Sequence, residues 1–201
     1  MIAGYHIIFG AYGHWLPNDP AGSWSEFVGS WELFRYGRAT KKLALTGKVD
    51  RSSFDAERAA AKQLLRRKPV EFTGLQARAV GQGFASYVER SGLLIWACAI
   101  MPDHVHLVVG PPGMKVEQLV IQLKGSATQR LLEEGIHPFQ HQRDKHGRPH
   151  KCFARGEWKV YLDPDDVESA IKYVEDNPIN EGLPAQRWRF VTRPPRDALR
   201  G

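Results

Sequence analysis

The sequence has few cysteines and no long apolar run, and each absence excludes a class of protein. Its 201 residues include two cysteines, Cys98 and Cys152, which are too few for a disulfide framework and fit a reducing cytosol. No stretch approaches the roughly 18 apolar residues of a membrane helix. The first residues have no basic segment followed by an apolar one, so no signal peptide is visible. We therefore expect a cytoplasmic protein without a membrane partner.

The common zinc motifs are also missing. There is no Cys-x-x-Cys pair and no His-Glu-x-x-His, the patterns by which many proteins bind zinc. The His-x-Glu and Pro-Cys-x-x-Cys elements of zinc deaminases are absent as well,. Any metal site in this chain must therefore combine ligands in another way.

Basic residues are in excess and are clustered along the chain. The formal net charge is +6 and the sequence pI is about 9.4, which is typical of nucleic-acid-binding domains. One cluster is interleaved with histidines, and its candidate DNA contacts are Arg143, Lys145, Arg148 and Lys151. Tryptophans lie in or near the basic segments, and basic side chains with stacking aromatics are typical of single-strand binding. A solvated basic surface over an aromatic core is the alternative.

Hydrophobic periodicity predicts an α+β chain. We expect strands over 4–12, 93–101, 104–110 and 153–162, and helices over 53–67, 74–90, 115–134 and from Asp163 to about Asn177-Pro178,. The core order β-α-β-β-α-β is that of the ferredoxin-like fold, an antiparallel sheet with helices on one face, here with an extra C-terminal helix. We expect a single domain over 1–201, with an insertion at 13–70 and a basic tail at 184–201.

Two histidines stand out in the strand predicted at 104–110. His104 and His106 flank Val105 in an apolar run, and alternate residues of a strand point to the same face. Two imidazoles on one face form a two-point metal ligand, although even two histidines at this spacing are more often coincidence than ligands. The pair needs a further ligand, and the identity of the metal stays open.

The last predicted helix carries Tyr173 and Asn177, four residues apart and therefore on one face,. Taken singly, Tyr173 is a packing residue and Asn177 a helix C-cap. Taken with the histidine pair, they offer a phenol and an amide oxygen to a metal site. A phenol is a weak nucleophile, but it can attack a phosphodiester if a metal withdraws charge from the phosphate.

Three stretches of the chain match one protein family in the right order. They are residues 5–9 (Tyr-His-Ile-Ile-Phe), residues 101–108 (Met-Pro-Asp-His-Val-His-Leu-Val) and residues 170–178 (Ala-Ile-Lys-Tyr-Val-Glu-Asp-Asn-Pro). The chain resembles the single-tyrosine transposases with a His-hydrophobic-His motif, the IS200-like and REP-associated tyrosine transposases. The resemblance covers roughly 4–12 and 74–183, and the insertion and the basic tail depart from the compact members.

The resemblance implies a nucleoid-associated enzyme that cuts and rejoins single-stranded or hairpin DNA through a 5′-phosphotyrosine. It implies Tyr173 as the nucleophile, and His104 and His106 as ligands of Mg²⁺ or Mn²⁺. Asn177 falls where REP-associated relatives place a third, oxygen ligand, for which other members use Gln. Relatives include swapped homodimers and monomers, and the sequence leaves both open. From the residues alone, Lys124 and Arg130 on the helix predicted over 115–134 are further candidate phosphate contacts.

Two other functions are alternatives to the transposase hypothesis. The chain could be a domesticated protein that binds hairpins or repeats without cutting, although such a module has no need of the two histidines and the tyrosine. It could instead be a metal-dependent hydrolase that attacks with water and leaves no protein–DNA adduct.

Overall fold

The computed structural model describes residues 2–14, 65–195 and 199. The helix predicted over 53–67 lies almost wholly outside these residues, and its last three residues form a bend. No helix among the described residues is both long and apolar enough to cross a membrane.

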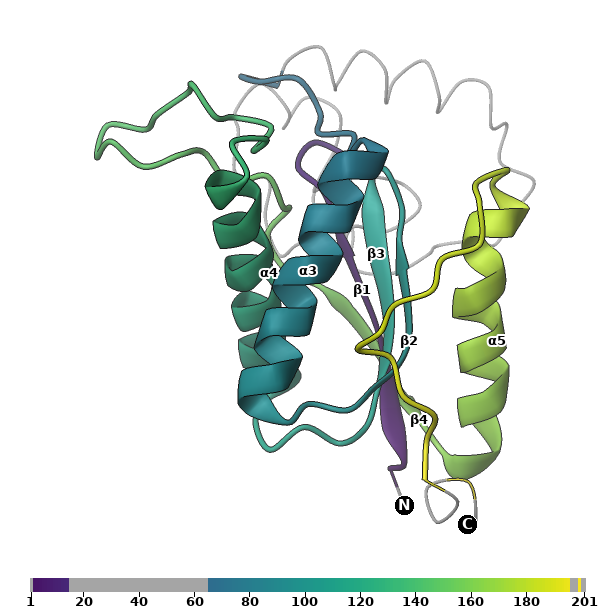
Figure 1. Cartoon of the computed structure of the whole chain (residues 1–201). Helices are drawn as coiled ribbons and strands as arrows, with labels where there is room; N and C mark the ends of the chain where they lie inside the picture. The colour runs from purple at the N-terminus through teal and green to yellow at the C-terminus, as the bar shows by residue number, and fades with distance from the viewer. Residues whose placement is uncertain (1, 15–64, 196–198, 200–201) are drawn as a thin grey trace, which may run out of the picture.

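The centre of the molecule is a four-stranded antiparallel sheet (Figure 1). Its strands are β1 (Gly4–Gly10), β2 (Ile95–Ile100), β3 (His104–Val109) and β4 (Trp158–Leu162). They lie in the order β2-β3-β1-β4, which is the arrangement of a ferredoxin-like sheet, and the predicted α+β fold class is confirmed. β4 begins later than predicted, because Phe153 makes only an isolated bridge to Ala11 and Gly156 takes a positive φ of 81°.

Among the described residues, three helices cover the sheet. Helices α3 (Gly74–Ser91) and α4 (Val116–Glu133) pack on one face, over a core that includes Val105 and Leu107. Helix α5 (Pro164–Asn180) packs on the other face, over a smaller core that includes Val108. The extra C-terminal helix was predicted, and Figure 1 shows that the sheet separates it from α3 and α4.

Helices α3 and α4 approach each other closely at Gly83. A Cβ atom on Gly83 would lie 2.6 Å from the Cα of Ala127, so only glycine allows this spacing. The Ser126 hydroxyl also donates to the Gly83 carbonyl at 2.8 Å. The N-terminus of α3 is held by a capping box between Thr73 and Gln76,.

Helix α5 does not end at Asn177-Pro178, as the proline predicted. It continues to Asn180, with Pro178 inside it. Proline removes one helical hydrogen bond, but Pro178 and Val174 are both buried, and their packing keeps the backbone helical. The helix ends where Leu183 donates to the Pro178 carbonyl at 2.8 Å.

The segment predicted to begin a basic tail is docked on the sheet. The Gln186 side chain bonds both the backbone N–H and the carbonyl of Ile100, each at 2.8 Å. The backbone N–H of Thr192 donates to the carbonyl of Ile95 at 2.9 Å, and the Trp188 ring lies against Gly81 of α3. Residues 186–192 therefore cover the free edge of β2, which an edge strand needs to avoid further pairing.

Candidate functional site

The two histidines of β3 lie side by side on the face that α5 covers. The Nε2 atoms of His104 and His106 are 2.8 Å apart. Two nitrogens that bind one octahedral ion in neighbouring positions lie about 3 Å apart, because each bond is about 2.1 Å long. The pair therefore has the spacing of two ligands of one ion.

The ring of His104 is held from its other side. Its Nδ1 lies 2.6 Å from Oδ1 of Asp103, and the other carboxylate oxygen lies 3.9 Å from Nδ1 of His14. Burial acts to raise the pKa of Asp103, but the hydrogen bond with His104 and the charges of His104 and His14 hold that pKa below its ordinary value. The carboxylate is thus an acceptor that directs the Nε2 lone pair of His104 toward His106.

Asn177 of α5 meets the same nitrogen of His106. Its Nδ2 lies 3.3 Å from Nε2 of His106, and its Oδ1 is buried with no hydrogen-bond partner. A 180° rotation of the amide exchanges the two atoms, so one buried amide atom lacks a partner in either orientation. Turned toward the histidines, the oxygen would complete a set of two imidazoles and one amide oxygen.

This donor set fits a divalent ion. In the described part of the chain, no group of three or more His, Cys, Asp or Glu side chains could hold a metal, so a third protein ligand has to be of another type. An amide oxygen beside two imidazoles suits an ion intermediate between the oxygen-preferring and nitrogen-preferring metals. The observation that supports the fit is that one end of the Asn177 amide lies 3.3 Å from Nε2 of His106, which is itself 2.8 Å from Nε2 of His104.

Two buried histidines, His106 and its neighbour His6 of β1, are neutral at neutral pH. Burial, with smaller contributions from the charges of His104 and His6, lowers the pKa of His106 to about 3. Burial also lowers the pKa of His6 to about 4. Neutral imidazole is the form that binds a metal, so His106 does not first have to lose a proton.

Tyr173 stands next to these histidines in the same chain. Its ring centroid lies 5.7 Å from that of His106 and 5.8 Å from that of His6. The side chain is 53% exposed, so a substrate can reach it. A single chain thus supplies the imidazoles of His104 and His106, the amide of Asn177 and the phenol of Tyr173.

The predicted contacts on α4 lie elsewhere. The Lys124 ammonium donates to the carbonyls of Ala154 and Gly156 at 3.0 and 2.6 Å, and it lies over the ring of Phe9, in the core that α3 and α4 cover. Burial lowers the pKa of Lys124 to about 8.

Arg130 bonds to Gln82 and Glu134 at 3.1 and 2.8 Å. Because α4 packs on the opposite face of the sheet from α5, Lys124 and Arg130 lie away from the histidine pair. Their contacts with DNA stay a prediction.

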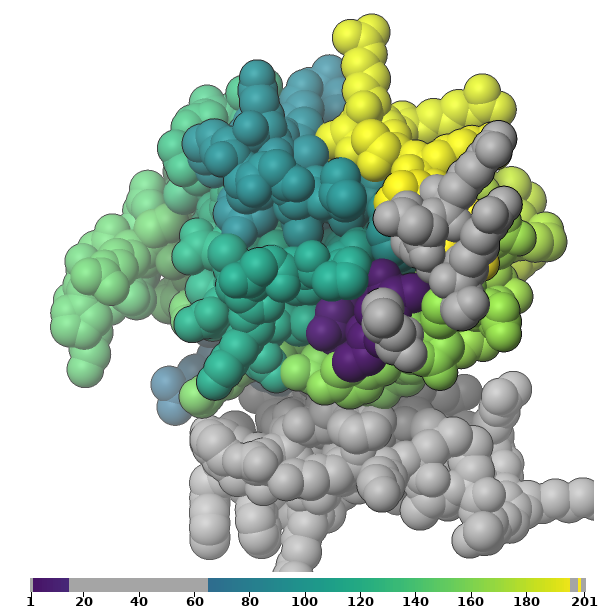
Figure 2. All heavy atoms as spheres, turned by 90° about the horizontal axis from the view of Figure 1, so that it is seen from below, coloured from purple at the N-terminus to yellow at the C-terminus, as the bar shows by residue number. Residues whose placement is uncertain are grey.

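The basic cluster after α4 forms a short turn that projects from the body of the protein, as the green loop in two perpendicular views shows (Figures 1 and 2). The backbones of Arg143 and Pro149 form an isolated antiparallel β-bridge. The Asp144 carboxylate accepts hydrogen bonds from the backbone N–H groups of His146 and Arg148 at 2.8 and 2.9 Å. We call residues 143–151 the basic hairpin. Its four predicted DNA contacts are all exposed: Arg143, Lys145, Arg148 and Lys151.

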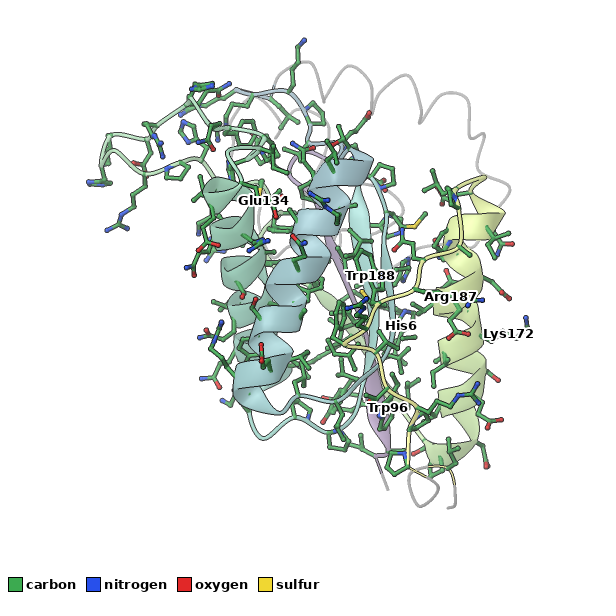
Figure 3. All side chains as sticks on the ribbon, in the orientation of Figure 1. His6, Trp96, Glu134, Lys172, Arg187 and Trp188 are labelled. Carbon is green, nitrogen blue, oxygen red and sulfur yellow. The ribbon has the colours of Figure 1, made fainter. Side chains whose placement is uncertain are left out.

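Sequence reasoning did not assign His6 to the site. It lies on β1, between the sheet and α5 (Figure 3), and its Nε2 is 3.1 Å from Nδ1 of His106. A histidine within the apolar start of β1 was the available signal, but only strand pairing reveals which residues it meets.

The family model described as "Transposase IS200 like" matches residues 64–177. This match spans more than half of the chain, and the chain belongs to the IS200-like transposase family. Its role is accordingly that of a DNA transposase. No curated protein sequence matches the chain.

Two solved structures are similar to this chain at low sequence identity. One is a REP-associated tyrosine transposase bound to a REP hairpin, with 11% identity over 92% of this chain and 72% of that chain, and a TM-score of 0.46. The other is a candidate transposase from Deinococcus radiodurans, with 15% identity over 86% of this chain and 88% of that chain, and a TM-score of 0.39.

Proposed function

We propose that this transposase cuts and rejoins single-stranded or hairpin DNA with Tyr173 as its nucleophile. His104, His106 and Asn177 would hold Mg²⁺ or Mn²⁺. The observation that supports the proposal is that the Tyr173 ring stands 5.7 Å from that of His106, whose Nε2 also meets His104 and Asn177.

The bound ion would withdraw charge from the scissile phosphate and help to orient it. The Tyr173 oxygen attacks phosphorus and loses its proton, while the bond between phosphorus and the 3′ oxygen breaks. The products are a 5′-phosphotyrosine and a DNA strand whose 3′ oxygen has gained a proton. Because the phosphotyrosine is itself a phosphodiester, a 3′-hydroxyl can attack it, release Tyr173 and rejoin DNA.

The remaining chemistry is positioning. The α5 helix presents Tyr173 and Asn177 one turn apart, so the nucleophile and the third ligand move together. The basic hairpin offers exposed cations to phosphates, which give affinity without reading sequence. All four site residues belong to one chain, so this site does not require a swapped homodimer.

The test is a denaturing gel with purified protein and hairpin DNA from the flanks of its own gene. The label belongs on the 3′ end, because the tyrosine would be joined to the fragment that carries the 5′-phosphate. We expect a slow, protease-sensitive band with Mn²⁺ or Mg²⁺ and none with EDTA. Tyr173→Phe should abolish it while DNA binding persists.

Tyr161→Phe is the matched control, because Tyr161 is 55% exposed and its ring lies beside that of Tyr5, with centroids 5.3 Å apart. Metal-dependent cleavage that survives Tyr173→Phe without an adduct would instead identify a hydrolase that attacks with water. DNA that is retarded in a native gel but never cut would identify a binding protein.

A further inference from the structure

His6 is packed behind the metal-facing histidine. Its Nε2 lies 3.1 Å from Nδ1 of His106, and the two rings stack with centroids 5.4 Å apart and an interplanar angle of 25°. His6 is 8% exposed and His106 is 4% exposed. The Trp158 ring closes the site from β4, 5.8 Å from that of His6.

The hydrogen bond between these rings decides which nitrogen of His106 carries a proton. A neutral imidazole has one N–H donor and one acceptor nitrogen. If Nδ1 of His106 donates to His6, Nε2 keeps a lone pair that points toward His104 and Asn177. If His6 donates instead, the proton of His106 sits on Nε2, where it blocks an ion.

An ion bound at Nε2 therefore requires a proton on Nδ1 of His106 and an acceptor for that proton. Because the two rings are buried, water cannot easily replace His6 as the acceptor, and a buried donor without a partner is costly. Metal-binding histidines commonly donate their second N–H to a fixed partner, whose loss weakens metal affinity about 10–100-fold.

We propose that His6 is a positioning residue that accepts the Nδ1 proton of His106 and so keeps its Nε2 directed at the metal. The inference rests on the proposed metal site and adds a partner behind it. His106 is then held by a histidine from β1, whereas His104 is held by the carboxylate of Asp103.

The experiment measures Mn²⁺ affinity by calorimetry on the full chain. His6→Phe keeps a ring but removes the acceptor, and we expect it to weaken Mn²⁺ binding about 10–100-fold. His6→Gln offers an amide oxygen near the same place, and we expect it to restore affinity to within a few-fold of the wild type. His137→Phe is the control, because His137 is also buried but bonds within its own turn.

A second measurement needs no variant of His6. In protein loaded with Mg²⁺, a nitrogen–nitrogen coupling across the hydrogen bond should join Nδ1 of His106 to Nε2 of His6, with the proton on His106. A proton on His6 Nε2, or no coupling, would overturn the proposal.

The outcomes separate this proposal from the metal site itself. Mn²⁺ binding that His104→Ala abolishes but His6→Phe leaves at wild-type strength refutes the role of His6 alone. Wild-type protein that binds no Mn²⁺, or whose binding survives His104→Ala, refutes the metal site and the role of His6 together. Equal weakening by His6→Phe and His6→Gln also counts against the hydrogen bond.

Discussion

Replacing Asn177 by Leu should stabilise the protein without metal and destabilise it with metal. The amide of Asn177 carries one buried atom without a partner, and its other end lies 3.3 Å from Nε2 of His106. Leucine has a similar shape and carries no polar group. The substitution therefore removes one buried polar atom without a partner, together with the amide end that faces the histidines.

The magnitude follows from three contributions. Removing the unsatisfied amide atom should gain about 1–3 kcal/mol, whereas losing the contact with His106 should cost about 1 kcal/mol. Leucine also favours the helix over asparagine by a few tenths of a kcal/mol. We expect the free energy of unfolding in EDTA to rise by about 1 kcal/mol.

With bound metal, the wild type should have the higher free energy of unfolding, in place of Asn177→Leu. An ion at 100 times its Kd stabilises the folded wild type by about 2.7 kcal/mol. If loss of the oxygen ligand raises Kd about 100-fold, the same ion stabilises the variant by about 0.4 kcal/mol. The wild type should then be the more stable protein by about 1 kcal/mol.

The assay is urea unfolding in EDTA and in Mn²⁺, for the wild type, Asn177→Leu and Asn180→Leu. Asn180 is exposed at the end of α5, so its variant should respond to Mn²⁺ like the wild type. The predicted role of Asn177 is refuted if Asn177→Leu gains as much stability from Mn²⁺ as the wild type does. It is also refuted if this variant is the less stable protein in EDTA.

Three further substitutions test other parts of the structure. Asp103→Asn weakens the acceptor that holds His104, and it should lower Mn²⁺ affinity about 10-fold in calorimetry. Arg148→Gln removes one exposed cation from the basic hairpin, and it should reduce the slope of log K for DNA against log salt by about 1, measured by fluorescence anisotropy. Gly83→Ala forces a Cβ to within 2.6 Å of the Ala127 backbone, and it should lower the free energy of unfolding by about 1–3 kcal/mol in urea.

Each of these substitutions has a matched control among exposed residues of the same type: Asp165→Asn, Arg90→Gln and Gly125→Ala. A Cβ on Gly125 meets nothing within 4 Å, so that variant should be stabilised by about 0.5–1 kcal/mol. Equal Mn²⁺ affinity in the two aspartate variants would contradict the role of the acceptor. Equal salt slopes would contradict the hairpin contact, and two stabilised alanine variants would contradict the tight packing of the helices.

Much of the fold could be predicted because its signals are local. Apolar residues at spacings of three and four marked α3 and α4, and the two apolar runs around Pro102-Asp103 marked β2 and β3. The errors arose where packing overrides local preference. Pro178 predicted a helix end, but Pro178 is buried and α5 continues through it to Asn180. The charge of the predicted tail did not indicate where it lies, because its docking depends on contacts of Gln186 with β2 and of the Trp188 ring with α3.

The sequence by itself determined which side chains share a face. Strand alternation put His104 and His106 together, and helical spacing did the same for Tyr173 and Asn177. Only the tertiary structure decided that these two faces meet, because that depends on α5 packing opposite α3 and α4. It also brought His6 to His106 across 100 residues of chain, since both strands carry their histidines on the face that α5 covers.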